Sequence, residues 1–332
     1  MFLGIDGGGT KTAFTLIDGE GRVLARHVDG SLYHPEVGLD AVAQVLRRGI
    51  AAVLQAAGAE AQALTFSFIG LPCHGEDSRL QPRLDALPQG LLPAGRYRCG
   101  NDMVCGWAGS LGGRDGVNIV AGTGSIAYGE WQGREARAGG WGELFSDEGS
   151  AYWIAREGLA LFSRMSDGRA EPGPLLALGR ERFGLQDDLD LCAAVYGPDG
   201  LGRSGLAGLA PWVAEAARSG DAGARAIFVA AASQLADIVV ATARRLQVPA
   251  EAVLPVSYSG GVFQADSLVL DPFRRLLAER WPSAQLMTPR FSPTVGAALQ
   301  AARLAGWSWS PEALERLGHP ADPVHAAPVE QG

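Results

Sequence analysis

The sequence predicts a mixed α/β protein built from two similar lobes. An apolar strand, a glycine-rich turn and a hairpin open the chain at residues 2–25, and the same order of elements returns at residues 117–138. Two copies of one supersecondary unit, each opening a domain, favour two lobes that face each other across a cleft. The length of 332 residues and the hydrophobic content of 47% agree with this division, because a single core rarely grows to that size.

The first lobe is expected over residues 1–112. Its opening strands are apolar, and Asp18-Gly19-Glu20-Gly21 between the second and third supplies the residues of a hairpin turn. Apolar residues at helical spacing follow the third strand, and two further apolar segments after this helix are predicted to be buried strands. In order, the sequence predicts strands at 2–5, 12–17 and 22–25, a helix at 39–57, a strand at 64–69 and a strand that begins at 97.

The second lobe is expected over residues 113–292 and is mostly helical after its opening hairpins. The predicted strands are 117–121, 126–131, 135–138 and 253–258, and the predicted helices are 149–165, 206–219, 222–246, 266–281 and 294–304. Residues 317–332 have no hydrophobic period, which predicts a loose tail.

Charge and cysteine content argue against several classes of function. A formal charge of −8 and a pI near 5.2 do not attract nucleic acid or an anionic membrane, whose phosphates favour clustered Lys and Arg. The four cysteines, Cys73, Cys99, Cys105 and Cys192, form no CxxC pair, which argues against structural zinc and for a reducing compartment. Because neither a signal peptide nor a long uninterrupted apolar run occurs, a soluble cytoplasmic protein is expected.

The strongest motif lies between the first two strands, at Asp6–Thr12. Glycine backbone can approach an anion closely and turn its N–H groups toward it, while Thr10 adds a hydroxyl donor and Lys11 a positive charge. Asp6 is placed to hold Mg²⁺ through water, since this ion keeps several waters and takes one or two carboxylates. The alternative is a simple tight hairpin, which usually needs fewer residues. The candidate phosphate-binding residues are Gly7, Gly8, Gly9, Thr10 and Lys11.

Two further glycine turns follow apolar strands. The turn Gly122–Ser125 also fits the dinucleotide pattern G-x-G-x-x-G/A, but the segment after it is extended where that pattern requires a helix. For the first turn, a Walker phosphate loop is disfavoured as well. In that pattern Lys directly follows the second Gly, whereas here Thr10 separates Gly9 from Lys11. Glycines at 260–261 could let a flat ligand lie against the backbone or form an ordinary strand-to-helix turn. Together the turns suggest the phosphates and adenosine of one nucleotide, held in the second lobe by Gly122, Thr123, Gly124, Gly260 and Gly261.

Acidic residues near the ends of strands could serve phosphoryl transfer to an alcohol, which needs a carboxylate beside the acceptor oxygen. Asp102 is the best candidate, because it follows a strand that begins at Tyr97. The alternative is that Asp102 caps the next helix. Further along, Asp147 and Glu148 could accept hydrogen bonds from sugar hydroxyls or cap the helix that follows them. Trp141 could pack against a sugar face or fill core.

Taken together, these motifs resemble the N-acetylglucosamine kinase branch of the BadF/BadG/BcrA/BcrD ATPase family. The resemblance runs from residue 3 to about 305 and is specific, because GGWG followed by DEGSAYWIA is far rarer than a single glycine turn. Family members share the duplicated ribonuclease-H-like fold of actin, hexokinase and the heat-shock chaperones. The resemblance therefore implies two lobes with an interdomain cleft, and a helix near 293–306 that packs back on the first lobe. The motifs are GIDGGGTKT at 4–12, Asp102, AGTGS at 121–125, GGWG at 139–142, SDEGSAYWIA at 146–155, SGGVF at 259–263 and PTVGAALQAA at 293–302.

The resemblance also implies an activity: phosphate transfer from Mg·ATP to a hydroxyl of an amino sugar, with N-acetylglucosamine as the expected substrate. In this assignment Asp102 is the general base and Asp6 holds Mg²⁺. The implied ATP contacts are Thr10 and Thr123 at the phosphates and Gly260 and Gly261 at the adenosine. The positions expected at the sugar are Tyr33, His34, Asn101, Ser125, Gly139, Gly140, Trp141 and Asp147.

One position departs from the family pattern. N-acetylglucosamine kinases carry an Asn-His pair after the first hairpin, and that Asn contacts the sugar, whereas this chain has Tyr33-His34. Glucosamine or another hexose derivative is therefore an alternative substrate. An ATPase that activates a dehydratase through a shared iron–sulfur cluster is a second alternative, but it would need cysteines beside the second glycine turn. A sugar sensor with a dead active site would not require Asp6, Asp102 and Asp147. The sequence leaves open whether the chain forms a homodimer.

Overall fold

The computed structural model describes residues 1–198 and 200–318, which form two compact units. The first unit contains Met1–Arg114 and the described part of Pro289–Gly332, and the second contains Asp115–Thr288. Each unit has its own sheet and its own hydrophobic core.

The first unit is built on a five-stranded mixed sheet with the strand order β3-β2-β1-β4-β5. Three strands form consecutive antiparallel hairpins, because short turns join them, and two more add in parallel beside β1. The strands are β1 (Phe2–Gly7), β2 (Thr12–Ile17), β3 (Val23–Asp29), β4 (Phe66–Leu71) and β5 (Tyr97–Asn101).

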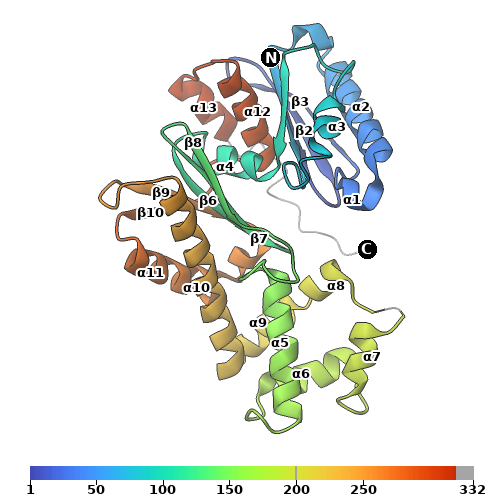
Figure 1. The fold of residues 1–332 in the computed structure, drawn as a ribbon, viewed down its shortest axis with the longest axis vertical. Helices are drawn as coiled ribbons and strands as arrows, with labels where there is room; N and C mark the ends of the chain where they lie inside the picture. The colour runs from blue at the N-terminus through green and yellow to red at the C-terminus, as the bar shows by residue number, and fades with distance from the viewer. Residues whose placement is uncertain (199, 319–332) are drawn as a thin grey trace. The chain divides into compact units, whose positions relative to one another are not determined.

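Helices cover both faces of this sheet, with α2 on one side and α12 and α4 on the other (Figure 1). The apolar stripe of α2 packs on Leu3, Ile5 and Phe14. On the opposite face α12 lies so close to β1 that a Cβ at Gly4 would collide with its backbone. The helices are α1 (His34–Val37), α2 (Leu39–Ala56), α3 (Gln81–Ala86), α4 (Met103–Leu111), α12 (Pro293–Leu304) and α13 (Pro311–Gly318), with a 3₁₀ turn at Ala61–Ala63.

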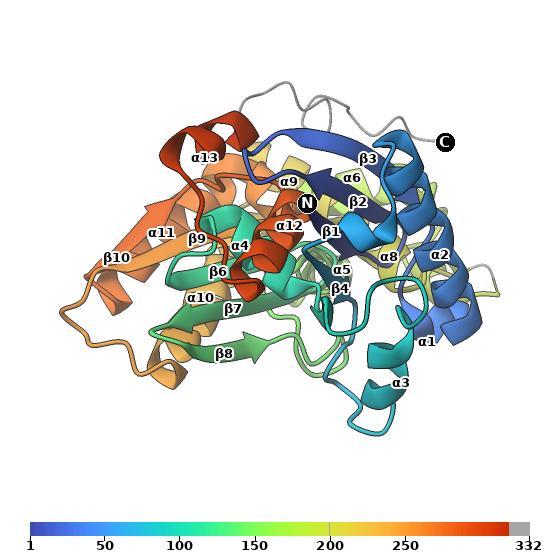
Figure 2. The ribbon, with the colours of Figure 1, turned by 90° about the horizontal axis from the view of Figure 1, so that it is seen from above.

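The second unit repeats this sheet. Its strand order, β8-β7-β6-β9-β10, is that of the first sheet element by element, with two antiparallel hairpins followed by two parallel additions. Figure 2 shows β9, β6, β7 and β8 side by side in this order. The strands are β6 (Gly116–Ala121), β7 (Ser125–Trp131), β8 (Arg134–Gly139), β9 (Leu254–Ser259) and β10 (Ala284–Met287). The repeat confirms the duplicated α/β architecture predicted from the sequence.

A large helical layer covers one face of the second sheet. The long helix α10 packs on the sheet and on α5, and the two run side by side in Figure 1. By length and composition α10 could cross a membrane, but more than half of its most apolar stretch is buried inside this unit, as in a core helix of a folded domain. The helices are α5 (Ala151–Ser166), α6 (Pro174–Phe183), α7 (Asp190–Tyr196), α8 (Arg203–Ala207), α9 (Ala210–Arg218), α10 (Ala222–Arg245) and α11 (Leu270–Arg280), with a 3₁₀ segment at Gly261–Leu268.

Several boundaries differ from the sequence predictions. The third strand continues to Asp29 instead of ending at residue 25. The helix expected at 206–219 is two helices, because Pro211 in the first turn of α9 cannot continue a preceding helix. The helix expected from 266 is preceded by a 3₁₀ segment and begins at Leu270. Residues 317–318 of the expected tail close α13, and the remainder of that tail lies outside the described residues.

Candidate active site

The first glycine turn joins β1 to β2 and presents exposed residues to solvent. Pairing of the two strands ends at Gly7 and Thr12, so the residues between them form the turn. The carbonyl of Gly8 accepts hydrogen bonds from the Leu32 amide at 3.1 Å and from Ser31 Oγ at 3.3 Å, which anchor the base of the turn. A Cβ at Gly9 would have nothing within 4 Å, so packing does not require glycine there. The exposed residues of the turn are Gly9, Thr10 and Lys11.

Asp6 and Asp102 are neighbours in the first unit. Asp6 lies at the end of β1, and Asp102 stands immediately before α4. Burial and then the negative charge of Asp102 raise the pKa of Asp6 to about 7, while a hydrogen bond with the Cys105 thiol opposes this shift. The two acidic residues that the sequence assigned to metal binding and proton acceptance are therefore brought together by the fold, although 95 residues of chain separate them.

The Asn101 side chain anchors the backbone around Asp102. The carboxamide of Asn101 donates to the His74 carbonyl at 3.1 Å and accepts from the Met103 amide at 3.1 Å. The Asp102 side chain makes no capping hydrogen bond with α4, so the capping alternative does not account for it. Asn101, which was expected at the sugar, uses its carboxamide on the backbone and orients the turn that carries Asp102.

Tyr33 and His34 lie next to the first glycine turn. The Tyr33 amide donates to Ser31 Oγ at 2.9 Å, and Ser31 in turn binds the Gly8 carbonyl. His34 begins α1, and its Nδ1 atom is buried without a hydrogen-bond partner among the described residues. A buried imidazole nitrogen of this kind can accept or donate one further hydrogen bond to a ligand.

The second glycine turn connects β6 to β7 and contacts the start of α5. The Gly122 carbonyl accepts from the Ala151 amide at 2.8 Å, and the Thr123 carbonyl accepts from the Tyr152 amide at 3.4 Å. The Thr123 side chain is exposed, and a Cβ at Gly122 would meet nothing within 4 Å. This turn therefore also offers backbone that a ligand could reach.

The third glycine turn borders a cavity of about 360 Å³, here called the Gly261 cavity. Gly260 has φ +100° and lies against Ala121, where a Cβ would collide with the backbone carbonyl. Gly261 lines the cavity itself. Mostly apolar side chains form its wall, and none of them was among the predicted binding residues: Ala151, Ile154, Ala207, Pro211, Ala214 and Phe228. Because Ala151 also holds Gly122, the cavity lies next to the second glycine turn.

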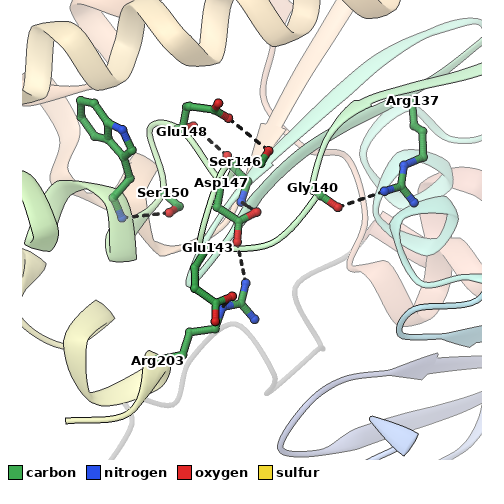
Figure 3. A network of polar contacts seen from close by, with 10 residues as sticks. Arg137, Gly140, Glu143, Ser146, Asp147, Glu148, Ser150 and Arg203 are labelled. Atoms are coloured by element: carbon green, nitrogen blue, oxygen red, sulfur yellow. Dashed lines mark hydrogen bonds and ion pairs between the residues drawn. The ribbon is translucent and has the colours of Figure 1, made fainter. Parts of the chain in front are cut away.

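Residues 140–149, here called the acid loop, follow β8. Gly139 ends that strand, and the Gly140 carbonyl accepts from Arg137 Nη2 at 3.0 Å (Figure 3). The Arg137 guanidinium also lies 5.9 Å from the ring centroid of Trp141, a distance typical of a cation–π contact. Trp141 is 69% exposed, so it does not fill core and has a free face for a ligand.

Asp147 is the most buried acid of this loop, with 2% of its surface exposed. Its carboxylate accepts from the Ser125 amide at 3.4 Å and from Arg203 Nη2 at 2.7 Å. Neither Asp147 nor Glu148 caps α5, because Ser150 does so by accepting from the Trp153 amide at 3.1 Å. Arg203 was not predicted, since nothing in its local sequence marks it and it lies 56 residues from Asp147.

The acidic residues of the site suit a magnesium ion that is bound together with phosphate groups better than an ion that protein side chains hold alone. In the described ranges, no group of three or more His, Cys, Asp and Glu side chains could hold an ion by itself. Mg²⁺ typically takes one or two carboxylates and completes its shell with phosphate oxygens and water. Asp6, at the edge of the first glycine turn, suits that requirement.

The chain is similar to curated sugar kinases over most of its length. It is 30% identical over 313 residues to the N-acetyl-D-glucosamine kinase of Dictyostelium discoideum, covering 91% of this chain and 97% of the relative. It is 27% identical over 298 residues to the N-acetylmuramic acid/N-acetylglucosamine kinase of Clostridium acetobutylicum, covering 90% and 96%. A solved structure of a candidate N-acetylglucosamine kinase from Chromobacterium violaceum superposes with a TM-score of 0.66 at 27% identity, covering 90% and 98%.

The family model described as the BadF/BadG/BcrA/BcrD ATPase family matches residues 3–301, nearly the whole described chain. This match confirms the resemblance read from the glycine and acid motifs. The chain belongs to the BadF/BadG/BcrA/BcrD ATPase family.

Proposed function

We propose that this protein is an ATP-dependent kinase that phosphorylates a hydroxyl group of an amino sugar, with N-acetylglucosamine as the first substrate to test. The observation that carries this proposal is the neighbouring pair Asp6 and Asp102 beside an exposed glycine turn. It is supported by the 30% identity to the N-acetyl-D-glucosamine kinase of Dictyostelium discoideum over nearly all of both chains.

The second unit supplies the features suited to the nucleotide base. An apolar cavity of about 360 Å³ can receive an adenine ring, and Gly261 at its wall lets the ligand lie against backbone. The exposed Thr123 and the backbone at Gly122 are suited to phosphate oxygens. In the first unit, the exposed Gly9, Thr10 and Lys11 ammonium are likewise suited to phosphate oxygens.

The sugar would be bound by the acid loop and by residues near the first turn. Trp141 offers an exposed ring to an apolar sugar face, and Asp147 with Ser125 lies at the base of the acid loop. His34 offers its unpartnered Nδ1 atom.

In the proposed reaction Asp102 accepts the proton of the acceptor hydroxyl while the oxygen forms a bond to the γ-phosphorus. The bond between that phosphorus and the β,γ-bridging oxygen breaks, and ADP leaves. Asp6 would hold Mg²⁺, which would neutralise charge on the phosphates. Carboxylates positioned as general bases contribute roughly 10²- to 10⁴-fold to such reactions.

The proposal includes a cytoplasmic location, where ATP is available, and a small-molecule partner rather than nucleic acid. The net charge of −8 supports the second point, because a polyanion would be repelled.

A sugar panel tests the proposal. ADP release is measured with N-acetylglucosamine, glucosamine, N-acetylmuramic acid and glucose, and the phosphorylated position is read by phosphorus NMR. We expect at least one amino sugar to raise ADP release well above the rate without sugar. Asp102→Asn should remove that increase, while Asp40→Asn, an exposed carboxylate on α2, should keep it. If no sugar raises ADP release, or if Asp102→Asn is as active as the parent protein, the proposal is wrong.

A further inference from the structure

Arg203 lies at the start of α8 and joins two acids of the acid loop. Its Nη2 atom is 2.7 Å from Asp147 Oδ2, and its Nε atom is 3.1 Å from Glu143 Oε2. Figure 3 shows the guanidinium reaching from α8 to both carboxylates. The planar guanidinium can donate in two directions at once, which an ammonium group on a flexible stem does less well.

Asp147 needs such a partner, because its position in the fold is unfavourable for an isolated carboxylate. It is 2% exposed, and its backbone has φ +57°, a left-handed conformation that is uncommon for residues with a side chain. A buried carboxylate is stable only when it is paired and hydrogen-bonded. Arg203 supplies the opposite charge, and the Ser125 amide supplies a hydrogen bond.

The same ion pair touches the second glycine turn. A Cβ at Gly124 would lie 2.7 Å from Arg203 Nη2 and 2.8 Å from Asp147 Oδ2. Ser125, the next residue, donates its Oγ to the Glu148 carbonyl at 2.7 Å. Three segments distant in sequence, namely the β6–β7 turn, the acid loop and α8, therefore meet at the Arg203–Asp147 pair.

We propose that Arg203 is a positioning residue that holds Asp147 and the acid loop in the conformation that binds the acceptor sugar. This inference rests on the proposed function, in which the acid loop binds the sugar. Arg203 acts through Asp147, and Glu143 acts as a second anchor for the guanidinium. Loss of the guanidinium would leave the Asp147 carboxylate buried and unpaired, so the loop would leave its present conformation.

A positioning role for Arg203 predicts different effects on the KM values for the two substrates, sugar and ATP. If Arg203 positions the acid loop, its loss raises the KM for the sugar and leaves the KM for ATP nearly unchanged. If Arg203 instead binds ATP phosphate directly, its loss raises the KM for ATP. A charge-assisted hydrogen bond of this kind corresponds to roughly a tenfold to hundredfold effect when it is removed.

The experiment measures kcat and both KM values for Arg203→Ala, Arg203→Lys and Glu143→Gln, using the sugar that the parent protein phosphorylates best. Arg180→Ala serves as the matched control, because Arg180 forms an exposed ion pair with Asp188 in the same unit. We expect Arg203→Ala to raise the KM for the sugar about tenfold or more, with partial rescue in Arg203→Lys and a smaller effect in Glu143→Gln. Arg180→Ala should behave like the parent protein.

Three outcomes overturn the inference: an unchanged sugar KM in Arg203→Ala, an increase confined to the KM for ATP, or equal increases in both KM values together with a lowered Tm. If Arg203→Ala does not fold, Arg203→Lys decides by the same criteria. Failure of the proposed function looks different, because in that case the parent protein itself phosphorylates no sugar.

Discussion

Asp102 lies close enough to Asp6 that its charge, added to the larger effect of burial, raises the pKa of Asp6 to about 7. These carboxylates come from the end of β1 and the start of α4, which the parallel strand β4 brings together. Gly70 of β4 lies between them. A Cβ at this position would collide with Cys105 Sγ and would lie 3.1 Å from Asp102 Cα.

The first prediction concerns the pH dependence of stability in the metal-free protein. The pKa of Asp6 is about 7 in the folded state and near 3.8 in the unfolded state, so the folded state binds the proton more tightly. The resulting stabilisation is complete below about pH 4 and is lost as the pH rises through about 7. At about 1.4 kcal/mol per pKa unit its upper bound is about 4 kcal/mol, and the partial exposure of Asp6 reduces this value.

Urea unfolding between pH 4 and 8 in the presence of a chelator checks this prediction. Asp6→Asn carries no titrating carboxyl, so its free energy of unfolding should fall less than that of the parent protein across this range. Asp40→Asn is the control, because that carboxylate is exposed. If the free energy of unfolding depends on pH in the same way for Asp6→Asn and the parent protein, the predicted contribution of Asp6 is wrong.

The second prediction is that Gly70→Ala impairs both activity and stability. A Cβ at this position would collide with Cys105 Sγ and would lie 3.1 Å from Asp102 Cα. Overpacking of this kind costs about 1–3 kcal/mol of stability, and a displaced catalytic residue can lower kcat about a hundredfold. Gly30→Ala is the control, since its Cβ would make an ordinary 3.5 Å contact with Val45. Full activity in Gly70→Ala would show that Asp102 tolerates displacement.

The third prediction is that filling the Gly261 cavity weakens ATP binding selectively. Ala207 is buried and lines the cavity, so Ala207→Leu would place added methyl groups in the space proposed for adenine. We expect the KM for ATP to rise roughly tenfold, with little change in the KM for the sugar. Steady-state kinetics with each substrate varied in turn measures both. Ser204→Leu adds comparable bulk at an exposed position of the same helix and should change neither value.

The fourth prediction concerns sugar discrimination at Tyr33. Tyr33→Asn introduces the amide that the family resemblance leads us to expect at this position, and it leaves the backbone bond from the residue 33 amide to Ser31 available. The ratio of kcat/KM for N-acetylglucosamine to that for glucosamine should rise about two- to tenfold, the range for one neutral hydrogen bond. Tyr33→Phe should leave the ratio near that of the parent protein. An equal rise in both variants would attribute the effect to loss of the hydroxyl.

The fifth prediction identifies a buried acid that serves stability alone. Asp221 accepts hydrogen bonds from the Ala224 amide at 3.0 Å and the Leu175 amide at 2.9 Å, joining the start of α10 to α6. Asp221→Ala would leave two buried amides without partners, which should lower the free energy of unfolding by about 2–4 kcal/mol. Urea denaturation measures this loss, and kcat/KM of the folded fraction should stay within about twofold of the parent value. A large loss of kcat/KM would instead connect Asp221 to the site.

Local signals in the sequence were sufficient for the features that depend on a few adjacent residues. The glycine turns at 7–11 and 122–125 and their flanking strands could be predicted, because strand alternation and turn chemistry are encoded within short windows. The cap of α5 illustrates the limit. Asp147 and Glu148 were candidate capping residues by their place before the helix, whereas Ser150 caps the helix and Asp147 turns inward to Arg203.

The sequence by itself determined the duplicated α/β fold, the family and the positions of the three glycine turns. Only the tertiary structure decided that Asp6 meets Asp102, that Asn101 holds the backbone, that a cavity opens beside Gly261 and that Arg203 pairs with Asp147. The physical reason is sequence distance. Hydrogen bonding within a turn involves neighbouring residues, so the local sequence shows a recognisable pattern. Burial and charge pairing depend on which distant segments pack together, and the local sequence does not identify those segments.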